Sequence, residues 1–316
     1  MELQNNGLCH SYQPVKNWHL QLPDDSHFSP VGIALNSKNQ LVIFSRAARE
    51  WTVRLAQPYT CITEKTILVA DAATGKIVSS LGNDLFVTPH GLCVDADDNT
   101  WVTDVELQQV FKFNAAGALL MTLGHAGIAG TDDVHFNMPT GVAVAGDGCV
   151  YVSDGYGNSR IVKFSATGTF LLQWGFHGTG AAAFDIPHAI TLDPLGHVYV
   201  ADRENRRIQV FDSNGKWLKI LGDKSFGSLC SMAYDIKNEQ LVAVDDLASA
   251  TNEHSGSDVI IFENGGNSFT KFGRSGAYDG PAGWYHDVAV DSSGNIFTAD
   301  LLGNTILKFE KKPGLQ

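Results

Sequence analysis

One pattern that recurs along the chain constrains its fold more than any other feature. Three copies of the pattern align almost without gaps; they are TPHGLCVDADDNTWVTDVELQQVFKFNAAGALLMTLG from Thr88, MPTGVAVAGDGCVYVSDGYGNSRIVKFSATGTFLLQWG from Met138 and IPHAITLDPLGHVYVADRENRRIQVFDSNGKWLKILG from Ile186. Each copy contains four strand-length segments of alternating apolar residues, separated by turns rich in Asp, Asn and Gly. Looser copies begin at Ser29, near Leu229 and at Trp284, which brings the number of repeats to six.

Four short antiparallel strands at a period of roughly 40 to 50 residues are typical of one blade of a β-propeller. The sequence therefore predicts an all-β, six-bladed β-propeller, because closing the blades into a ring leaves no exposed sheet edge. The last copy ends after three strands, and we expect the segment WHLQL, residues 18–22, to supply its outer strand. We assign residues 1–17 to an N-terminal extension, 18–312 to a single catalytic propeller domain and 313–316 to a C-terminal tail.

The amino-acid composition limits the kinds of molecule that the chain is expected to bind. The formal net charge of -12 and the pI near 5.2 argue against binding to nucleic acid or to an anionic membrane surface, which both favour clustered Lys and Arg. No apolar run reaches the length of a membrane span, and the first residues lack the layout of a secretion signal. The five cysteines are scattered without a CxxC pair. We expect a monomeric, cytoplasmic protein, or a secreted or secretory-lumen protein if a signal has been removed.

Histidines occur at equivalent positions of alternate repeats. Aligning the copies places one residue of each at the start of its innermost strand, in the order Val31, His90, Thr140, His188, Cys230 and His286. Alternate blades of a six-fold ring lie about 120° apart, so three imidazoles would converge from three sides on the propeller axis. The arrangement predicts a three-histidine metal site with a position open for water or substrate. Neutral imidazoles favour zinc, and iron or manganese stay possible.

Other polar residues near this ring have competing interpretations. Cys230 is a rival fourth ligand, although a buried structural thiol is the simpler interpretation of it. Aspartates recur after the second strand of most repeats, and recurrence indicates that they cap turns; they are Asp104, Asp154, Asp202 and Asp300. Residues that do not recur lie beside them, namely Arg46, Tyr156 and Arg203. Two cations and a phenol on one rim could hold a carboxylate and move a proton, but each alone could equally be a surface or packing residue.

Longer strings resemble one enzyme family. TILVADAATGKI, TPHGLCVDADDNTWVTDVELQQVFKF, YVSDGYGNSRIVKFS, YVADRENRRIQVF and YHDVAVDSSGNIFTADLLGNTILKF are similar to peptidyl-α-hydroxyglycine α-amidating lyase, a propeller family with NHL-type repeats. The resemblance covers roughly residues 18 to 310 and includes the three histidines. It implies a zinc-dependent lyase that cleaves the C–N bond of an α-hydroxyglycine substrate, a small carbinolamide or a peptide, to an amide and glyoxylate.

The resemblance also implies roles for individual residues. Zn²⁺ would be held by His90, His188 and His286, and the catalytic tyrosine and two arginines would be Tyr156, Arg46 and Arg203. A structural Ca²⁺ would be held by the backbone carbonyls of Ile33 and Leu92 and by the carboxylate of Asp287; oxygen ligands suit calcium.

The chain also departs from the family. The disulfide positions hold Asn137 with Gly157 and Tyr199 with Val210, and Trp284 and Tyr285 replace the Met-Pro that usually precedes the third histidine. A copper monooxygenase domain is missing from the sequence, so a separate upstream monooxygenase would have to supply hydroxyglycines. Three alternatives stay open: a lyase for a small carbinolamide such as ureidoglycolate, a metal-dependent propeller hydrolase or lactonase, and a non-enzymatic NHL propeller that acts as an interaction module.

Overall fold

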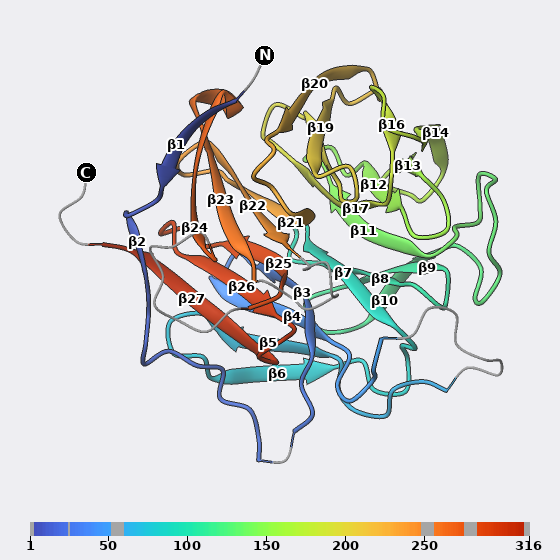
Figure 1. The fold of residues 1–316 in the computed structure, drawn as a ribbon. Helices are drawn as coiled ribbons and strands as arrows, with labels where there is room; N and C mark the ends of the chain where they lie inside the picture. The colour runs from blue at the N-terminus through green and yellow to red at the C-terminus, as the bar shows by residue number, and fades with distance from the viewer. Residues whose placement is uncertain (1–2, 25, 52–59, 248–255, 275–282, 313–316) are drawn as a thin grey trace.

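A computed structural model describes residues 3–24, 26–51, 60–247, 256–274 and 283–312 of the chain. Six of its sheets, each of four or five strands, are arranged around a central axis, so the predicted all-β, six-bladed propeller is confirmed (Figure 1). The innermost strand of each sheet contacts the innermost strands of both neighbouring sheets, which closes the ring. The tail predicted at 313–316 lies outside the described residues.

The first four blades are four-stranded, antiparallel and consecutive in the sequence. Blade one contains β3 (Pro30–Leu35), β4 (Gln40–Ser45), β5 (Ile67–Asp71) and β6 (Ile77–Leu81). Blade two contains β7 (Pro89–Val94), β8 (Thr100–Asp104), β9 (Gln109–Phe113) and β10 (Leu119–Leu123). Blade three contains β11 (Pro139–Val144), β12 (Val150–Asp154), β13 (Arg160–Phe164) and β14 (Phe170–Trp174). Blade four contains β17 (Pro187–Leu192), β18 (Val198–Asp202), β19 (Arg207–Phe211) and β20 (Trp217–Gly222).

The last two blades each take a strand from the N-terminus. Blade five contains β21 (Ser228–Asp235), β22 (Gln240–Asp246), β23 (Asp258–Glu263) and β24 (Ser268–Gly273), with β1 (Gln4–Leu8) added parallel to β24. Blade six contains β25 (Tyr285–Val290), β26 (Ile296–Asp300) and β27 (Thr305–Lys311), and β2 (Tyr12–Pro14) pairs antiparallel with β27. The short pair β15 (Phe176–His177) and β16 (Ala183–Phe184) lies between blades three and four in the sequence. A 3₁₀ turn, η1 (Asn264–Gly266), joins β23 and β24 of blade five. No helix among the described residues is long and apolar enough to cross a bilayer.

The expectation that residues 18–22 close the last blade is wrong, because β2 occupies that edge. The register pairs Tyr12 with Lys311 and Pro14 with Phe309. The apolar side chains of the 18–22 segment pack between blades six and one instead: the Trp18 indole donates to the Ala72 carbonyl and lies edge-on to Phe297. Strand pairing therefore begins within residues 1–17, the segment predicted to be an extension.

Alternating side chains of the strands bury the core between blades. The described residues contain six clusters of buried apolar side chains, and each cluster draws on two neighbouring blades. This follows from the two-residue period of a strand, which places every second side chain on the face that meets the next blade. The packing fixes the angle at which each inner strand approaches the axis, where the site lies.

Candidate metal centre and active site

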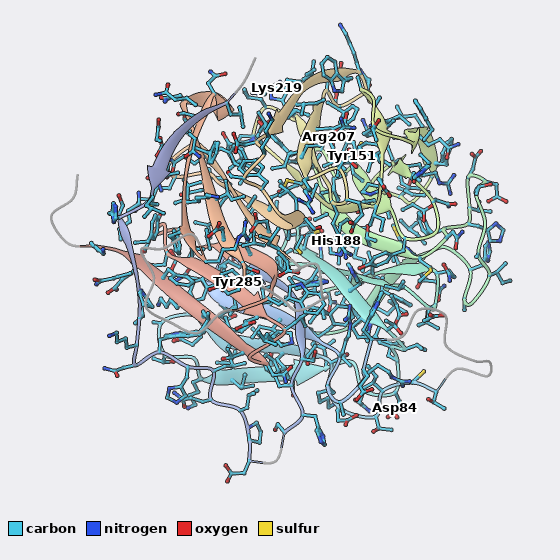
Figure 2. All side chains as sticks on the ribbon, viewed as in Figure 1. Asp84, Tyr151, His188, Arg207, Lys219 and Tyr285 are labelled. Atoms are coloured by element: carbon cyan, nitrogen blue, oxygen red, sulfur yellow. The ribbon has the colours of Figure 1, made fainter. Side chains whose placement is uncertain are left out.

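The three predicted histidines meet at the propeller axis. His90 is on β7, His188 on β17 and His286 on β25, and all three are buried. One nitrogen from each lies within 4.8 Å of the others, and the described residues hold no second group of three or more such metal ligands. In Figure 2, His188 lies near the centre of the ring, whereas Lys219 and Arg207 lie farther out in blade four. The chain can therefore bind a metal ion at this triad.

Intervening blades orient the imidazoles. The Nδ1 atom of His90 lies 2.6 Å from the Thr140 carbonyl, and the Nδ1 atom of His188 lies 2.6 Å from the Cys230 carbonyl. The Nδ1 atom of His286 lies 2.7 Å from the Val31 carbonyl. Because a carbonyl only accepts, each Nδ1 carries the proton and each Nε2 keeps its lone pair for a metal.

Electrostatics keep the triad neutral. Burial, followed by the charges of the other two histidines, lowers the pKa of His90 well below its ordinary value. Burial and then the charge of Arg203 do the same for His188, and burial and then Arg46 lower the pKa of His286 to about 3. Metal ligation requires unprotonated imidazole. The lowered pKa values keep the three imidazoles in this form, so the triad is suited to binding a metal cation.

Cys230 takes part through its backbone rather than its thiol. Its carbonyl accepts from His188, while its thiol donates to the Ser228 carbonyl at 3.6 Å. Burial raises the pKa of this thiol to about 12, which disfavours the thiolate that a metal would need. The metal-ligand group at the axis contains the three histidines without Cys230.

Tyr156 lies directly above two of the histidines. Its hydroxyl is 3.0 Å from Nε2 of His90 and 2.9 Å from Nε2 of His188. The tyrosine follows β12 by two residues, and Gly155 before it lies so close to the Pro187 carbonyl that a Cβ there would approach the oxygen to 2.2 Å. Only glycine fits at this point, which lets the chain turn the phenol toward the axis.

The two predicted arginines lie on opposite sides of Tyr156 in sequence and reach the same site. An Nη atom of Arg203 is 3.4 Å from the Tyr156 hydroxyl. Arg46 is buried, and its Nε donates to the Pro89 carbonyl at 2.9 Å. Burial raises the pKa of the Tyr156 phenol, while the charges of Arg203 and Arg46 lower it. The structure thus brings together all six residues predicted for the zinc site and catalysis.

A cavity of about 360 Å³, which we call the loop cavity, opens over the triad on the Tyr156 side. It is lined by Arg46, Trp51, Met138, Tyr156, Ile186, His188, Arg203, Cys230, Trp284, His286 and Leu301. Sequence reasoning did not single out Trp51. Its ring lies 5.2 Å from that of Tyr156, and the Arg46 guanidinium carbon is 4.5 Å from its centroid. The sequence offered one signal for its role, which is that this aromatic residue follows the candidate arginine Arg46 by five positions.

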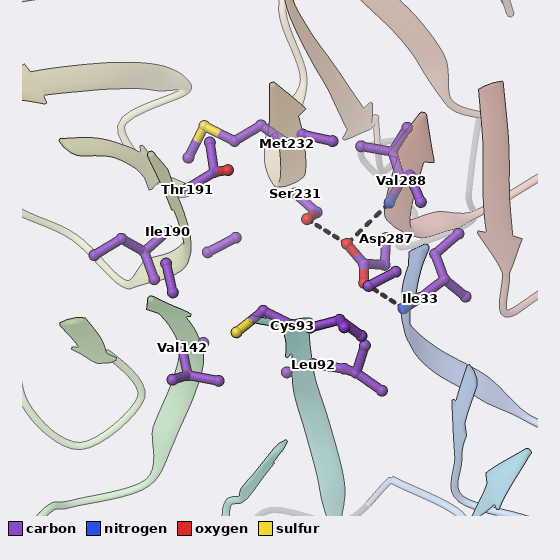
Figure 3. Close-up of a pocket in the computed structure, with 18 of the residues that line it drawn as sticks. Ile33, Leu92, Cys93, Val142, Ile190, Thr191, Ser231, Met232, Asp287 and Val288 are labelled. Carbon is purple, nitrogen blue, oxygen red and sulfur yellow. Dashed lines mark hydrogen bonds between the residues drawn. The ribbon is translucent and has the colours of Figure 1, made fainter. Parts of the chain in front are cut away.

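A second cavity of about 360 Å³, the channel cavity, lies on the other side of the triad between the inner strands. The residues predicted to bind calcium, Ile33, Leu92 and Asp287, line it (Figure 3). The Asp287 carboxylate accepts from the Ile33 N–H at 2.6 Å, from the Ser231 hydroxyl at 2.5 Å and from the Val288 N–H at 2.9 Å. Burial raises its pKa to about 7, while these three hydrogen bonds act in the opposite direction.

The positions that match the family's disulfides are adjacent without being bridged. The Asn137 side chain donates to the Gly157 carbonyl at 3.1 Å, and Tyr199 is the cross-strand partner of Val210. All five cysteines of the chain are free.

Residues 136–164 and 184–211 match the NHL repeat family. The chain is 37% identical over 297 residues to peptidyl-glycine alpha-amidating monooxygenase of Mus musculus, covering 88% of this chain and 30% of that protein. It is 36% identical over 311 residues to peptidyl-alpha-hydroxyglycine alpha-amidating lyase 1 of Drosophila melanogaster, covering 88% of this chain and 56% of that protein. The chain thus spans between about a third and about half of the length of these relatives.

Solved structures share the fold at low identity. A virginiamycin B lyase from Staphylococcus aureus superimposes with a TM-score of 0.60 at 15% identity, over 96% of this chain and 88% of that chain. A gluconolactonase from Xanthomonas campestris superimposes with a TM-score of 0.63 at 13% identity, over 99% of this chain and 98% of that chain. At such identity the likeness concerns the fold alone.

Proposed function

We propose, on the premise that this NHL-repeat propeller is a homologue of the peptidyl-alpha-hydroxyglycine alpha-amidating lyases, that it cleaves the C–N bond of an α-hydroxyglycine to an amide and glyoxylate. One observation carries the proposal: the Tyr156 hydroxyl lies within 3.0 Å of Nε2 atoms of two histidines of the triad, with an arginine at 3.4 Å. A proton acceptor, a metal site and a cation thus converge on one point of the loop cavity. This chemistry needs all three.

The donor set fits zinc better than iron or manganese. Three neutral imidazoles with their Nδ1 protons held by backbone carbonyls are typical of zinc sites that leave a position for substrate. A zinc ion on His90, His188 and His286 would act as a Lewis acid that lowers the pKa of a substrate hydroxyl.

Tyr156 would move the proton. In R–CO–NH–CH(OH)–COO⁻ the hydroxyl proton leaves, the C–N bond breaks as the C=O bond of glyoxylate forms, and the nitrogen gains a proton to become the amide. Tyr156 as phenolate would accept the first proton and return it to the nitrogen, so no water is consumed. Burial opposes the phenolate, whereas Arg203 and Arg46 favour it; a cation on the triad would favour it further.

The arginines would hold the substrate carboxylate. Guanidinium groups bind carboxylates through paired N–H donors, and both cations border the loop cavity. A carboxylate held between the two arginines would place the adjacent carbinol carbon over the triad. Binding of the carboxylate would thus also orient the reacting carbon toward the metal site.

The apolar part of the loop cavity favours an acyl substrate over ureidoglycolate. Its wall includes Trp51, Met138, Ile186, Trp284 and Leu301. An acyl or peptidyl group can bury apolar surface against this wall, whereas the terminal amide of a ureido group would lose hydrogen bonds to water there. Such α-hydroxyglycines would come from a monooxygenase reaction that hydroxylates the glycine α-carbon.

Calcium is proposed for the channel cavity. The buried Asp287 carboxylate would bind it together with the backbone carbonyls of Ile33 and Leu92, a set of hard oxygen ligands. A cation bound there would offset the cost of burying the Asp287 charge.

Elemental analysis and a glyoxylate-release assay on α-hydroxyhippurate test the proposal together. We expect zinc in stoichiometric amount, and a Tyr156→Phe variant should lose about 100-fold or more in kcat. Tyr151→Phe is the matched control, since that hydroxyl donates to the Ser213 carbonyl in the blade and should leave kcat within about threefold. Ureidoglycolate and a lactone are assayed alongside; turnover of either, without glyoxylate from α-hydroxyhippurate, would reject the proposed substrate.

A further inference from the structure

Arg46 differs from the other arginines that lie within the blades. Arg160, Arg207 and Arg274 are paired with buried aspartates at 2.9, 2.7 and 2.6 Å. Arg46 is 4% exposed, yet it forms no ion pair with any of the described residues. The charge of Asp104 offsets the cost of burying this cation only in part, since burial still lowers the pKa of Arg46 to about 10. A ligand or another group would have to offset the rest.

The group that contacts this cation is an aromatic ring. The guanidinium carbon of Arg46 lies 4.5 Å from the centroid of Trp51, well within the range of a cation–π contact. The same indole lies 5.2 Å from the ring of Tyr156 and 6.0 Å from that of His90. One side chain therefore contacts a cation, a phenol and a metal-ligating imidazole of the loop cavity.

The choice of an aromatic ring over a carboxylate has a consequence for binding. A ring attracts a guanidinium through its π face and leaves the in-plane N–H groups free. In Arg46, Nε donates to the Pro89 carbonyl, and no acceptor among the described residues binds its Nη groups, which would then be available to a ligand. A carboxylate partner from the protein would occupy these donors and neutralise the charge that a ligand needs.

We propose that Trp51 is a positioning residue of the site, whose indole holds the Arg46 guanidinium in the loop cavity with its Nη donors available to the carboxylate of the substrate. The inference rests on the proposed function. Arg203, in contrast, has its Nε 3.0 Å from the Glu204 carboxylate and an Nη 3.4 Å from the Tyr156 hydroxyl, so part of this guanidinium already faces groups of the protein. Arg46 is then the principal anchor of the carboxylate, and Trp51 keeps it in place.

Three variants test this role: Trp51→Leu, Trp51→Phe and, as a control, Trp217→Leu, which removes an exposed indole from the outer strand of blade four. Two quantities are measured for each variant: the Kd of hippurate for the metal-free protein, and KM and kcat for α-hydroxyhippurate with the metal-loaded protein. Hippurate carries the same acyl group and carboxylate but has no hydroxyl to react. Thermal melting reports on the fold.

Trp51→Leu should raise both the Kd of hippurate and KM by about tenfold, because it removes the ring that holds the cation. Trp51→Phe keeps an aromatic face and should stay within about threefold of wild type in both quantities. Trp217→Leu should change neither. A residue that only supports the fold would instead lower the melting temperature and kcat while leaving Kd and KM unchanged.

The inference would be overturned if Trp51→Leu stayed within twofold of wild type in Kd and KM, or if the Phe and Leu variants lost equally. A wild-type protein that does not bind hippurate would overturn it as well. Hippurate binding without glyoxylate release would refute the proposed reaction and leave the role of Trp51 to be decided by Kd alone.

Discussion

Two sets of polar residues lie in the same blades and differ in how they recur. Aspartates near the end of the second strand occur in blades two to six, and Ser45 replaces them in blade one. Histidines at the start of the innermost strand occur in alternate blades only. The carboxylates are buried and bound to backbone N–H groups, whereas the histidines border cavities.

The aspartates hold the chain where it enters each inner strand. The Asp104 carboxylate accepts from the N–H groups of Val87 and Thr88, and Asp300 accepts from the N–H of Trp284. In blade one the Ser45 hydroxyl accepts from the N–H of Ser29. The interpretation of the recurring aspartates as turn caps is therefore confirmed. Features that every blade repeats build the fold, and features that break the repeat build the site.

Removing a histidine should have the largest effect on activity. We expect His188→Ala to lose the metal ion and to lower kcat/KM by about 1000-fold, or about 4 kcal/mol, because two imidazoles cannot complete the site. The free energy of unfolding of the metal-free protein should change far less. Metal content by elemental analysis and kcat/KM for glyoxylate release are the measurements.

Cys230→Ala is the matched control for this variant, since residue 230 has the equivalent place in the next blade. Its carbonyl, which orients His188, is retained in the variant. Metal content should not change, and kcat/KM should stay within about threefold of wild type. If Cys230→Ala also lost the metal, the assignment of the site to alternate blades would be wrong.

Removing a buried aspartate should lower the stability of the fold and leave the activity nearly unchanged. Asp104 accepts four backbone N–H groups, from Val87, Thr88, Glu106 and Leu107. Asp104→Ala leaves these buried donors without an acceptor, which we expect to cost about 3 kcal/mol of unfolding free energy, measured by urea denaturation. The kcat/KM of the folded protein should stay within about threefold, because the contact of His90 with Thr140 is unaffected.

An exposed aspartate provides the comparison for Asp104→Ala. Asp147 lies in the turn between β11 and β12, where it accepts from the N–H of Cys149, and its replacement by Ala should cost about 0.5 kcal/mol. Equal destabilisation by the two variants would contradict the view that the buried aspartates fix the entry to each inner strand.

The repeat made most of this architecture predictable, because a two-residue period and recurring turns are local signals. The three histidines followed from the same alignment. The closing strand did not: residues 12–14 contain a single buried aromatic, Tyr12, while Trp18, Leu20 and Leu22 gave the stronger alternation and pack between blades instead. The N-terminal strand pairs with the last blade only because the ring brings the two ends of the chain together. Local alternation of apolar residues does not predict such a pairing.

The contacts that backbone groups make in the site could not be predicted from the sequence either. The carbonyls that orient the histidines come from Val31, Thr140 and Cys230, and any residue type could supply them. Trp51 belongs to the insertion in blade one, outside the repeat, so the alignment gave it no partner. Sequence thus predicted the side chains that define the site better than the groups that hold them in place.

The smallest expected effect concerns a partly exposed aspartate that joins two blades. Asp98, in the turn between β7 and β8, accepts from the Ser37 hydroxyl at 2.6 Å and from the Ser37 N–H at 2.7 Å, and these bonds lower its pKa. A carboxyl whose pKa is lower in the folded state contributes stability above its unfolded pKa near 4 and loses it as the pH falls through the folded value. Wild type should therefore exceed Asp98→Asn in unfolding free energy at pH 7 by less than about 1 kcal/mol, since water and salt screen the site. The gap should close below about pH 3, and urea denaturation at several pH values measures it; a gap that widened toward low pH would mean that the bonds to Ser37 favour the protonated acid.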